Sequence, residues 1–232
     1  MSAPNGHAEG NVTTASGTNS HAEGSSTTAS GLNSHAEGND TTASGNNSHA
    51  EGSSNTASGV NSHAEGAGNT ASAENSHAEG SGTQASGYQA HAEGSGSVAS
   101  GSRSHAEGTG TVAYGMSQHA QGRYNQSHDP VNAEIEAWEA GKSYDYGDVI
   151  CTNGTVYGCL EPNSDDVFTA RKWSTMGNSK VAFMIGNGVS NDIRHTGFAI
   201  LWDGSVMARK KIVIGNTTIT ESQLQALPAL LN

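Results

Sequence analysis

The feature that most constrains this chain is a phrase, Ser-His-Ala-Glu-Gly or a close variant, that returns every fourteen residues through its first half. The nine histidines of the phrase are His7, His21, His35, His49, His63, His77, His91, His105 and His119. A second phrase, Ala-Ser-Gly, follows seven residues after the alanine of the first, so each unit consists of two similar halves. A fixed period of this kind predicts a repeat architecture in which each unit stacks on its neighbours.

Each seven-residue half suits a short strand followed by a turn. Thr, Ser, Asn and Gly disfavour helix, and seven residues are too few for a helical hairpin. A strand of about five residues plus a Gly or Asn turn fits the length. Two strands per unit therefore predict one flattened coil of a parallel β-roll, with a rise of about 4.8 Å per coil.

Alternation along the strands assigns the faces of the coil. Neighbouring side chains of a strand point in opposite directions, so in Ser20-His21-Ala22-Glu23-Gly24 the alanine opposes the histidine and the glutamate. In Thr27-Thr28-Ala29-Ser30-Gly31 the alanine again faces the other way from its neighbours. We expect both alanines inside the coil, where only a methyl group fits. A roll with so little apolar core buries too little surface to be stable alone, which predicts association through one outer face.

Comparison of the units indicates which face associates. The histidine position never varies, and the glutamate position changes only at Gln121, whereas the Thr28 position also holds Gln84, Val98 and Val112. The alternative is disorder, because Gly-, Ser-, Thr- and Asn-rich sequence often fails to fold. The His, Ala and Gly positions stay in phase while the turn positions drift, and this favours the folded roll.

The phrase and its companion resemble the head repeat of trimeric autotransporter adhesins, a left-handed parallel β-roll whose common phrase is Ser-Val-Ala-Ile-Gly. In that family the Val and Ile positions face a three-fold axis, so the resemblance implies a homotrimer with His and Glu at the axis. The expected trimer-axis ladder consists of His21, Glu23, His35, Glu37, His49, Glu51, His63, Glu65, His77, Glu79, His91, Glu93, His105 and Glu107.

Two interpretations of this ladder remain open. Buried imidazoles and carboxylates need hydrogen-bond partners, and a His–Glu network between chains would supply them and fix the register. Imidazole is also a common ligand of Zn²⁺, Fe or Ni²⁺, so the ladder is a possible metal site, although cations in every layer would crowd one another. The sequence indicates no other cofactor.

Charge and composition exclude several functions. The net charge is −12, with 10 Lys and Arg against 22 Asp and Glu, which opposes binding to nucleic acid or to an anionic membrane. No apolar run is long enough to insert into a bilayer. We expect no enzyme: Ser127, His128 and Asp129 are adjacent, which does not build a catalytic triad, and the His-x-Glu phrase lacks the cysteine ligands of zinc deaminases.

The period ends near residue 126, and an aromatic segment follows. The Asn153-Gly154 turn predicts a hairpin that pairs Thr152 with Thr155 and Cys151 with Val156. Cys159 then falls on the opposite face from Cys151, so we expect two thiols and no disulfide.

The aromatic segment resembles the small chitin-binding β-modules of chitinases and phage tail proteins, through Trp138, Tyr144, Gly147-Asp148-Val149, Tyr157 and Trp173. The exposed tryptophan pair of that family is replaced here by Gly158-Cys159-Leu160-Glu161. We expect Trp138 and Trp173 in the core of the module. Aromatic faces pack on sugar rings, so Tyr144, Tyr146 and Phe168 are the candidate carbohydrate-binding platform, with a bacterial cell-surface polysaccharide as ligand.

The C-terminal part holds further strand signals. Residues 181–188 and 197–206 resemble a segment near the ends of tail and host-recognition proteins from phages of Gram-positive bacteria. Thr220 to Leu227 opens with a capping-box pattern, and Leu224, Leu227 and Leu231 have helical spacing, which predicts a short helix.

The sequence therefore predicts an all-β homotrimer: a β-roll of 14-residue coils over 1–126, a small aromatic β-module over 127–177, a β-rich trimerising segment over 178–216 and a short helix over 217–232. The expected function is host recognition by a phage tail fibre or receptor-binding protein on the virion tail or another extracellular particle, in contact with other tail or baseplate proteins. The alternatives are a fragment of a trimeric bacterial surface adhesin and a secreted polysaccharide-processing enzyme whose catalytic part is absent.

Overall fold

The computed structural model describes residues 3–125, 137–144, 149–153, 155–159, 168, 173–177, 181–187, 196–201, 206–208, 211–214 and 217–220. All regular secondary structure in these residues is β-strand, so the described part of the fold is all-β, as predicted. A helix long and apolar enough to cross a membrane is accordingly not found in this part of the chain.

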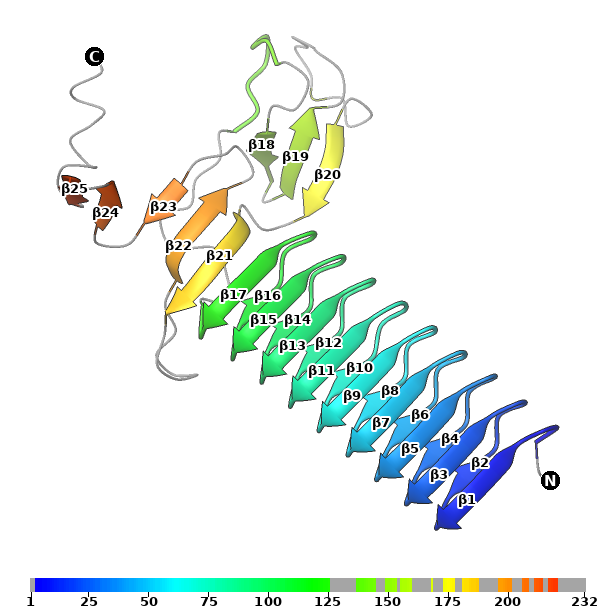
Figure 1. The fold of residues 1–232 in the computed structure, drawn as a ribbon. Coiled ribbons are helices and arrows are strands. Elements are labelled where there is room, and N and C mark those ends of the chain that lie inside the picture. The colour runs from blue at the N-terminus through cyan, green and yellow to red at the C-terminus, as the bar shows by residue number, and fades with distance from the viewer. Residues whose placement is uncertain are drawn as a thin grey trace.

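The first half of the chain is the predicted parallel β-roll (Figure 1). Each coil contributes one strand to each of two parallel sheets, and each strand pairs in register with the strand fourteen residues away. The long strands of the first sheet, each beginning at a repeat histidine, are β1 (His7–Asn11), β3 (His21–Ser25), β5 (His35–Asn39), β7 (His49–Ser53), β9 (His63–Ala67), β11 (His77–Ser81), β13 (His91–Ser95), β15 (His105–Thr109) and β17 (His119–Arg123). The short strands of the second sheet are β2 (Thr14–Ala15), β4 (Thr28–Ala29), β6 (Thr42–Ala43), β8 (Thr56–Ala57), β10 (Thr70–Ala71), β12 (Gln84–Ala85), β14 (Val98–Ala99) and β16 (Val112–Ala113).

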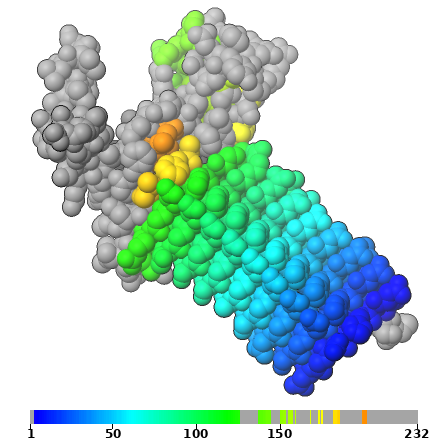
Figure 2. All heavy atoms as spheres, in the orientation of Figure 1, coloured from blue at the N-terminus to red at the C-terminus, as the bar shows by residue number. Residues whose placement is uncertain are grey.

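The interior of the roll is lined by alanine. Ala22 and Ala29 are fully buried, and so are their counterparts in the coils that follow. His21 and Glu23 lie on the outer face, so the alternation predicted from the sequence is confirmed. Figure 2 shows the consequence, a block with closely packed coils.

Two columns of buried polar side chains complete the interior, and the sequence analysis did not name them. One column holds Thr27, Thr41, Asn55, Asn69, Thr83, Ser97, Thr111 and Asn125. The other includes Ser20, whose Oγ donates to the carbonyl oxygen of Gly17 at 2.7 Å. In the first column Asn69 Nδ2 donates to the carbonyl oxygen of Gly80 at 2.9 Å. These short side chains give backbone carbonyls at bends and near strand ends a hydrogen-bond partner.

The turns depend on left-handed residues. Gly24 has φ +110°, and a Cβ atom there would collide with the carbonyl oxygen of Gly38 in the next coil. At a second corner Asn19, Asn33 and Asn47 have φ between 55° and 57°. Their side-chain amides hydrogen bond from coil to coil at 3.0–3.1 Å in an exposed asparagine ladder, a residue type suited to this backbone conformation.

The first sheet continues beyond the repeats. Strand β21 (Val181–Asn187) pairs in parallel with β17, with Phe183 beside His119 and Ile185 beside Gln121. Strands β22 (Thr196–Leu201) and β23 (Val206–Ala208) then extend the sheet in antiparallel fashion (Figure 1). Strand β21 is thus the first-sheet strand of a tenth coil, and residues 124–182 take the place that residues 110–118 have in the coil before.

The aromatic module is a separate three-stranded antiparallel sheet of β18 (Val149–Thr152), β19 (Thr155–Cys159) and β20 (Trp173–Gly177). The predicted hairpin is confirmed, with Thr152 opposite Thr155 and Cys151 opposite Val156. The two cysteines form no disulfide.

The prediction of a C-terminal helix over 217–232 is wrong for its first four residues. Thr217–Thr220 is strand β25, which pairs in antiparallel fashion with β24 (Lys211–Ile214), so a hairpin crosses the boundary expected after residue 216. Thr217, Thr218, Ile219 and Thr220 are all β-branched, which suits a strand. The leucines of the expected helix lie outside the described residues.

Candidate functional site: the histidine–glutamate ladder

The outer face of the first sheet carries a ladder of paired imidazoles and carboxylates. Because β1, β3 and the later long strands pair in exact phase, each His lies beside the next His and each Glu beside the next Glu. From His21 to His119 the imidazole rings stack with centroids 4.7–4.9 Å apart. The coil rise predicted from the sequence is therefore realised, and the structure brings all fourteen predicted ladder residues into two adjacent columns.

The histidine stack ends at a phenylalanine ring in a different orientation. Phe183 of β21 meets His119 edge-on, with ring centroids 5.3 Å apart and an angle of 89°. Ile185 takes the glutamate position of the same coil, where it lines a groove with Glu93, Glu107 and Gln121. The polar ladder is thus followed by one apolar rung.

Histidine and glutamate pair differently along the roll. Near the N-terminus the pairs lie within one coil, as in His21 Nε2 to Glu23 Oε2 at 3.6 Å. Toward the C-terminal end the histidine pairs with the glutamate of the coil before, as in His105 Nε2 to Glu93 Oε1 at 3.5 Å. His63 stands between the two regimes, 3.9 Å from both Glu51 and Glu65.

The ladder is half-buried in a single chain. Between His35 and His105 each His or Glu side chain retains about a third of its exposure, for example 34% at His105 and 33% at Glu93. The Nε2 atoms are nevertheless shielded from solvent and have no hydrogen-bond partner at His21, His35, His49, His63, His77, His91, His105 and His119. Shielded nitrogens of this kind are costly unless a further group satisfies them.

Crowding shifts the acidity of three groups in the ladder. Burial, followed by the charges of the neighbouring histidines, lowers the pKa of His49 and of His77. Side-chain hydrogen bonding with Glu65, then burial and the neighbouring carboxylate Glu37, raise the pKa of Glu51 to about 7. Like charges held in one column disfavour the charged forms.

A shallow groove of about 640 Å³ follows the glutamate column. Its walls are Glu37, Glu51, Glu65, Glu79 and Glu93, and its floor is formed by glycines such as Gly52 and Gly66. Groups of three ligand atoms within 4.8 Å of one another occur along the ladder, most with one histidine and two glutamates. The groove and these groups make the ladder the most chemically distinctive surface of the described residues.

The aromatic module places its predicted platform differently. Tyr144 is 3% exposed, packs edge-on against Trp173, and its hydroxyl oxygen accepts a hydrogen bond from the backbone N–H of Glu139. The expectation that Tyr144 is exposed is therefore wrong, because the ring is part of a core too small to spare it. Phe168 is half-buried between Trp138 and Tyr157.

The two tryptophans lie where they were expected. Trp173 is buried and Trp138 packs against the same core. Tyr146 lies outside the described residues, so its role in sugar contact stays a prediction.

Comparison with known families assigns the repeats. The model of the YadA head domain repeat matches residues 8–34, 22–48, 78–104 and 92–117, each match covering two copies. Residues 8–48 and 78–117 of the roll therefore match YadA head repeats. Heads made of YadA repeats are typically trimeric, and the repeats point to a trimeric adhesin-like protein. Comparison with curated proteins gives no match.

Sequence reasoning missed the tenth rung. Phe183-Met184-Ile185-Gly186 repeats the spacing of His119-Ala120-Gln121-Gly122, with glycine in the same place. Alignment of these two phrases by their glycine, after the long interruption, would have revealed the rung.

Proposed function

We propose that the chain is a trimeric adhesin-like fibre, in which the roll is a stiff spacer and the aromatic module makes the surface contact. The observation that carries the proposal is the set of shielded Nε2 atoms that make no hydrogen bond, along one face of a roll whose core is alanine. Such a face needs further groups to satisfy it, and such a core needs further buried surface. Three copies of the same face supply both.

The oligomeric state tests the proposal. Sedimentation velocity of the full chain should give a trimer, and substitution of His63 and His77 by Ser should shift the equilibrium toward monomer. Both histidines are about one third exposed and outward, so their removal leaves the alanine core intact. Thr28→Ser, on the outer face of the second sheet, is the control. A compact, stable monomer of the unaltered chain would overturn the proposal.

Sugar binding is proposed for the aromatic module. Phe168 and Trp138 pack at 5.9 Å between ring centroids and both keep part of their surface exposed. Aromatic faces of this kind suit the C–H faces of pyranose rings. Three modules on one fibre would turn weak single contacts into useful avidity.

A glycan array with bacterial surface polysaccharides tests this step. Phe168→Ala should abolish binding, whereas Tyr88→Ala, which removes a 47% exposed tyrosine of the roll, should leave binding unchanged. The far-ultraviolet circular dichroism of both variants should match the unaltered chain. Equal glycan binding by the two variants would show that Phe168 of the aromatic module does not contact the glycan.

The setting of the fibre is a choice between a cell surface and a phage tail. The matched repeats favour the bacterial surface adhesin. The tail-fibre setting is supported by the resemblance of residues 181–188 and 197–206, and of the aromatic segment, to parts of phage tail proteins. Immunogold labelling decides between them: label on the cell envelope supports the adhesin, and label on particle tails supports the tail fibre.

A further inference from the structure

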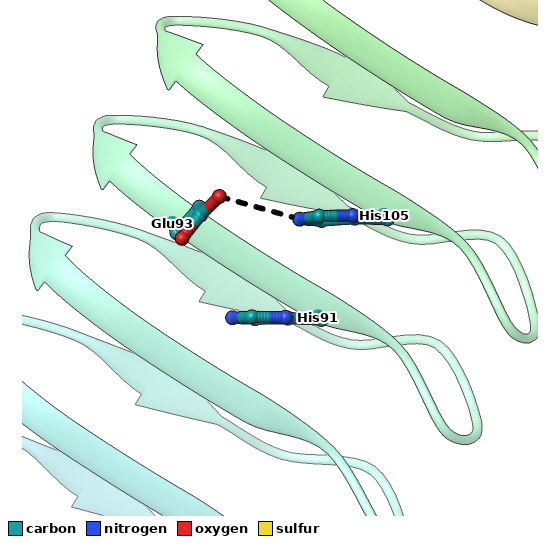
Figure 3. Close-up of side chains that lie close together, drawn as sticks. All are labelled: His91, Glu93 and His105. Carbon is teal, nitrogen blue, oxygen red and sulfur yellow. Dashed lines mark ion pairs between the residues drawn. The ribbon is translucent and has the colours of Figure 1, made fainter.

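Three side chains converge near the C-terminal end of the ladder. His91, Glu93 and His105 each offer one ligand atom, and these atoms all lie within 4.8 Å of one another. Figure 3 shows the two imidazole rings parallel, with Glu93 directed at the edge of His105. Strands β13 and β15 position the three side chains, because their parallel register sets His91 beside His105.

The spacing within this group suits a shared cation. Glu93 Oε1 lies 3.5 Å from His105 Nε2. A hydrogen bond between a charged imidazole and a carboxylate is shorter, about 2.8 Å. Zinc ligands at about 2.1 Å in a tetrahedral arrangement are separated by roughly 3.4 Å. The observed separation is thus the one that two ligands of a single ion require.

The environment of the imidazole nitrogens also favours a bound ion. The Nε2 atoms of His91 and His105 are shielded from solvent and make no hydrogen bond. An Nε2 without a proton next to a carboxylate oxygen sets two lone pairs against each other, which is unfavourable unless a proton or a cation lies between them. We propose that His91, Glu93 and His105 bind one divalent transition-metal ion of the Zn²⁺ class.

The donor set selects the class of ion. Two imidazole nitrogens and one carboxylate suit Zn²⁺, Co²⁺ or Ni²⁺, whereas Ca²⁺ and Mg²⁺ prefer oxygen ligands alone. His91 pairs with Glu79 at 3.5 Å in the structure, so it exchanges Glu79 for the ion by rotation of its side chain. A water molecule or a further protein ligand completes the coordination.

The position along the ladder follows from composition. Among the described residues, this is the group of three that contains two histidines, and the other groups contain one. An ion in the next coil would lie about one ring spacing, 4.8 Å, away and would be repelled. One tight ion per chain is therefore expected. All three ligands belong to one chain, and their face is the one that meets the other copies in the proposed trimer.

Equilibrium dialysis of the full chain against ZnCl₂, with elemental analysis, measures the ion count. Glu93→Gln and His105→Gln should each remove one tightly bound ion per chain. Glutamine fits the glutamate column, since Gln121 already occupies a glutamate position. Glu74→Gln makes the same charge change at an exposed turn outside the ladder and should keep the ion.

Cobalt supplies an independent signal. Co²⁺ bound to the unaltered chain should show the intensified visible absorption of a nitrogen-ligated, low-coordinate ion, and Glu93→Gln should return the spectrum of hydrated Co²⁺. An unchanged ion count in Glu93→Gln, or an equal loss in Glu74→Gln, would overturn the proposal. Sedimentation of the same samples reports the trimer separately, so failure of one proposal is distinguishable from failure of the other.

Discussion

Glu51 is the residue whose pKa shows most clearly that the carboxylates of the ladder are crowded. It lies 4.0 Å from His49 and 3.9 Å from His63, too far for strong pairing, and it shares its column with Glu37 and Glu65. The raised pKa, about 7 against an ordinary 4.5, means that the folded chain holds this proton more tightly than the unfolded chain does. The free energy of unfolding contributed by Glu51 therefore falls as pH rises from about 4.5 to about 7.

Glu51→Gln should remove this loss. We expect the variant to be more stable than the unaltered chain at pH 8, with the difference shrinking toward pH 4.5, because the protonated carboxyl resembles the amide. Urea unfolding across this pH range measures the effect. His49 and His77 contribute a pH dependence of the opposite sign to the free energy of unfolding, but both proteins contain these histidines, so their contribution cancels in the difference. Glu74→Gln, at an exposed turn, is the control. Parallel stability profiles for Glu51→Gln and the unaltered chain would contradict the assignment.

At the residue scale, strand alternation was enough to predict the inward alanines and the outward ladder. Ala22 and His21 differ by one position in a strand, and their faces follow from that alone. Thr27 and Ser20 lie two positions before Ala29 and Ala22, so the same alternation extends to their burial, although the sequence analysis applied it to the alanines alone. Tyr144 was misplaced because its burial depends on Trp173, a contact that no local pattern encodes.

Strand β21, which the sequence analysis expected as a strand but not as part of the ladder, sets the end of the ladder. Phe183 and Ile185 are half-buried at positions that hold His and Glu in the coils before. In the proposed trimer three copies of this rung would form an apolar layer above a polar column. Full burial of one such side chain would contribute about 1.5–3 kcal/mol to the free energy of association.

Exchange of this rung for a polar one should weaken the trimer. The double substitution Phe183→His and Ile185→Glu restores the ladder phrase, and we expect the trimer dissociation constant to rise at least about tenfold. Sedimentation equilibrium measures the change. Val60→Thr, at an exposed turn of the roll, should have no effect. An unaltered dissociation constant for the double variant would place the rung outside the interface.

Local signals served the elements unevenly. The Asn153-Gly154 turn determined the hairpin of β18 and β19, because the turn type fixes the register. The pairing of β17 with β21 joins strands 57 residues apart, residues 124–180, and local patterns carry no information about such a distance. The capping-box pattern begins at Thr220, the last residue of β25, and its other residues lie outside the described part of the chain.

On the scale of the whole molecule, the roll behaves as a one-dimensional stack. Each coil contacts its two neighbours through the same backbone hydrogen bonds and the same columns. Stability in such a stack is a sum of coil and neighbour terms, so the number of coils is adjustable while their phase is not.

Removal of residues tests this distinction. Deletion of 35–48, one full coil, should leave a folded roll that is shorter by about 4.8 Å and melts near the unaltered temperature. Deletion of 35–41, half a coil, brings Thr42 where a histidine belongs and interrupts every column at the junction. Small-angle scattering and thermal melting compare the two. Equal stability of the two deletions would show that phase does not matter.

The excursion between β17 and β21 has a consequence for engineering. The sheet resumes in register after residues 124–182, so the roll tolerates a whole folded unit where a nine-residue link, 110–118, suffices one coil earlier. The same junction should accept a foreign domain whose termini span the gap that such a link bridges. Each fibre would then carry its cargo at one defined height, displayed beside a rigid rod of chosen length.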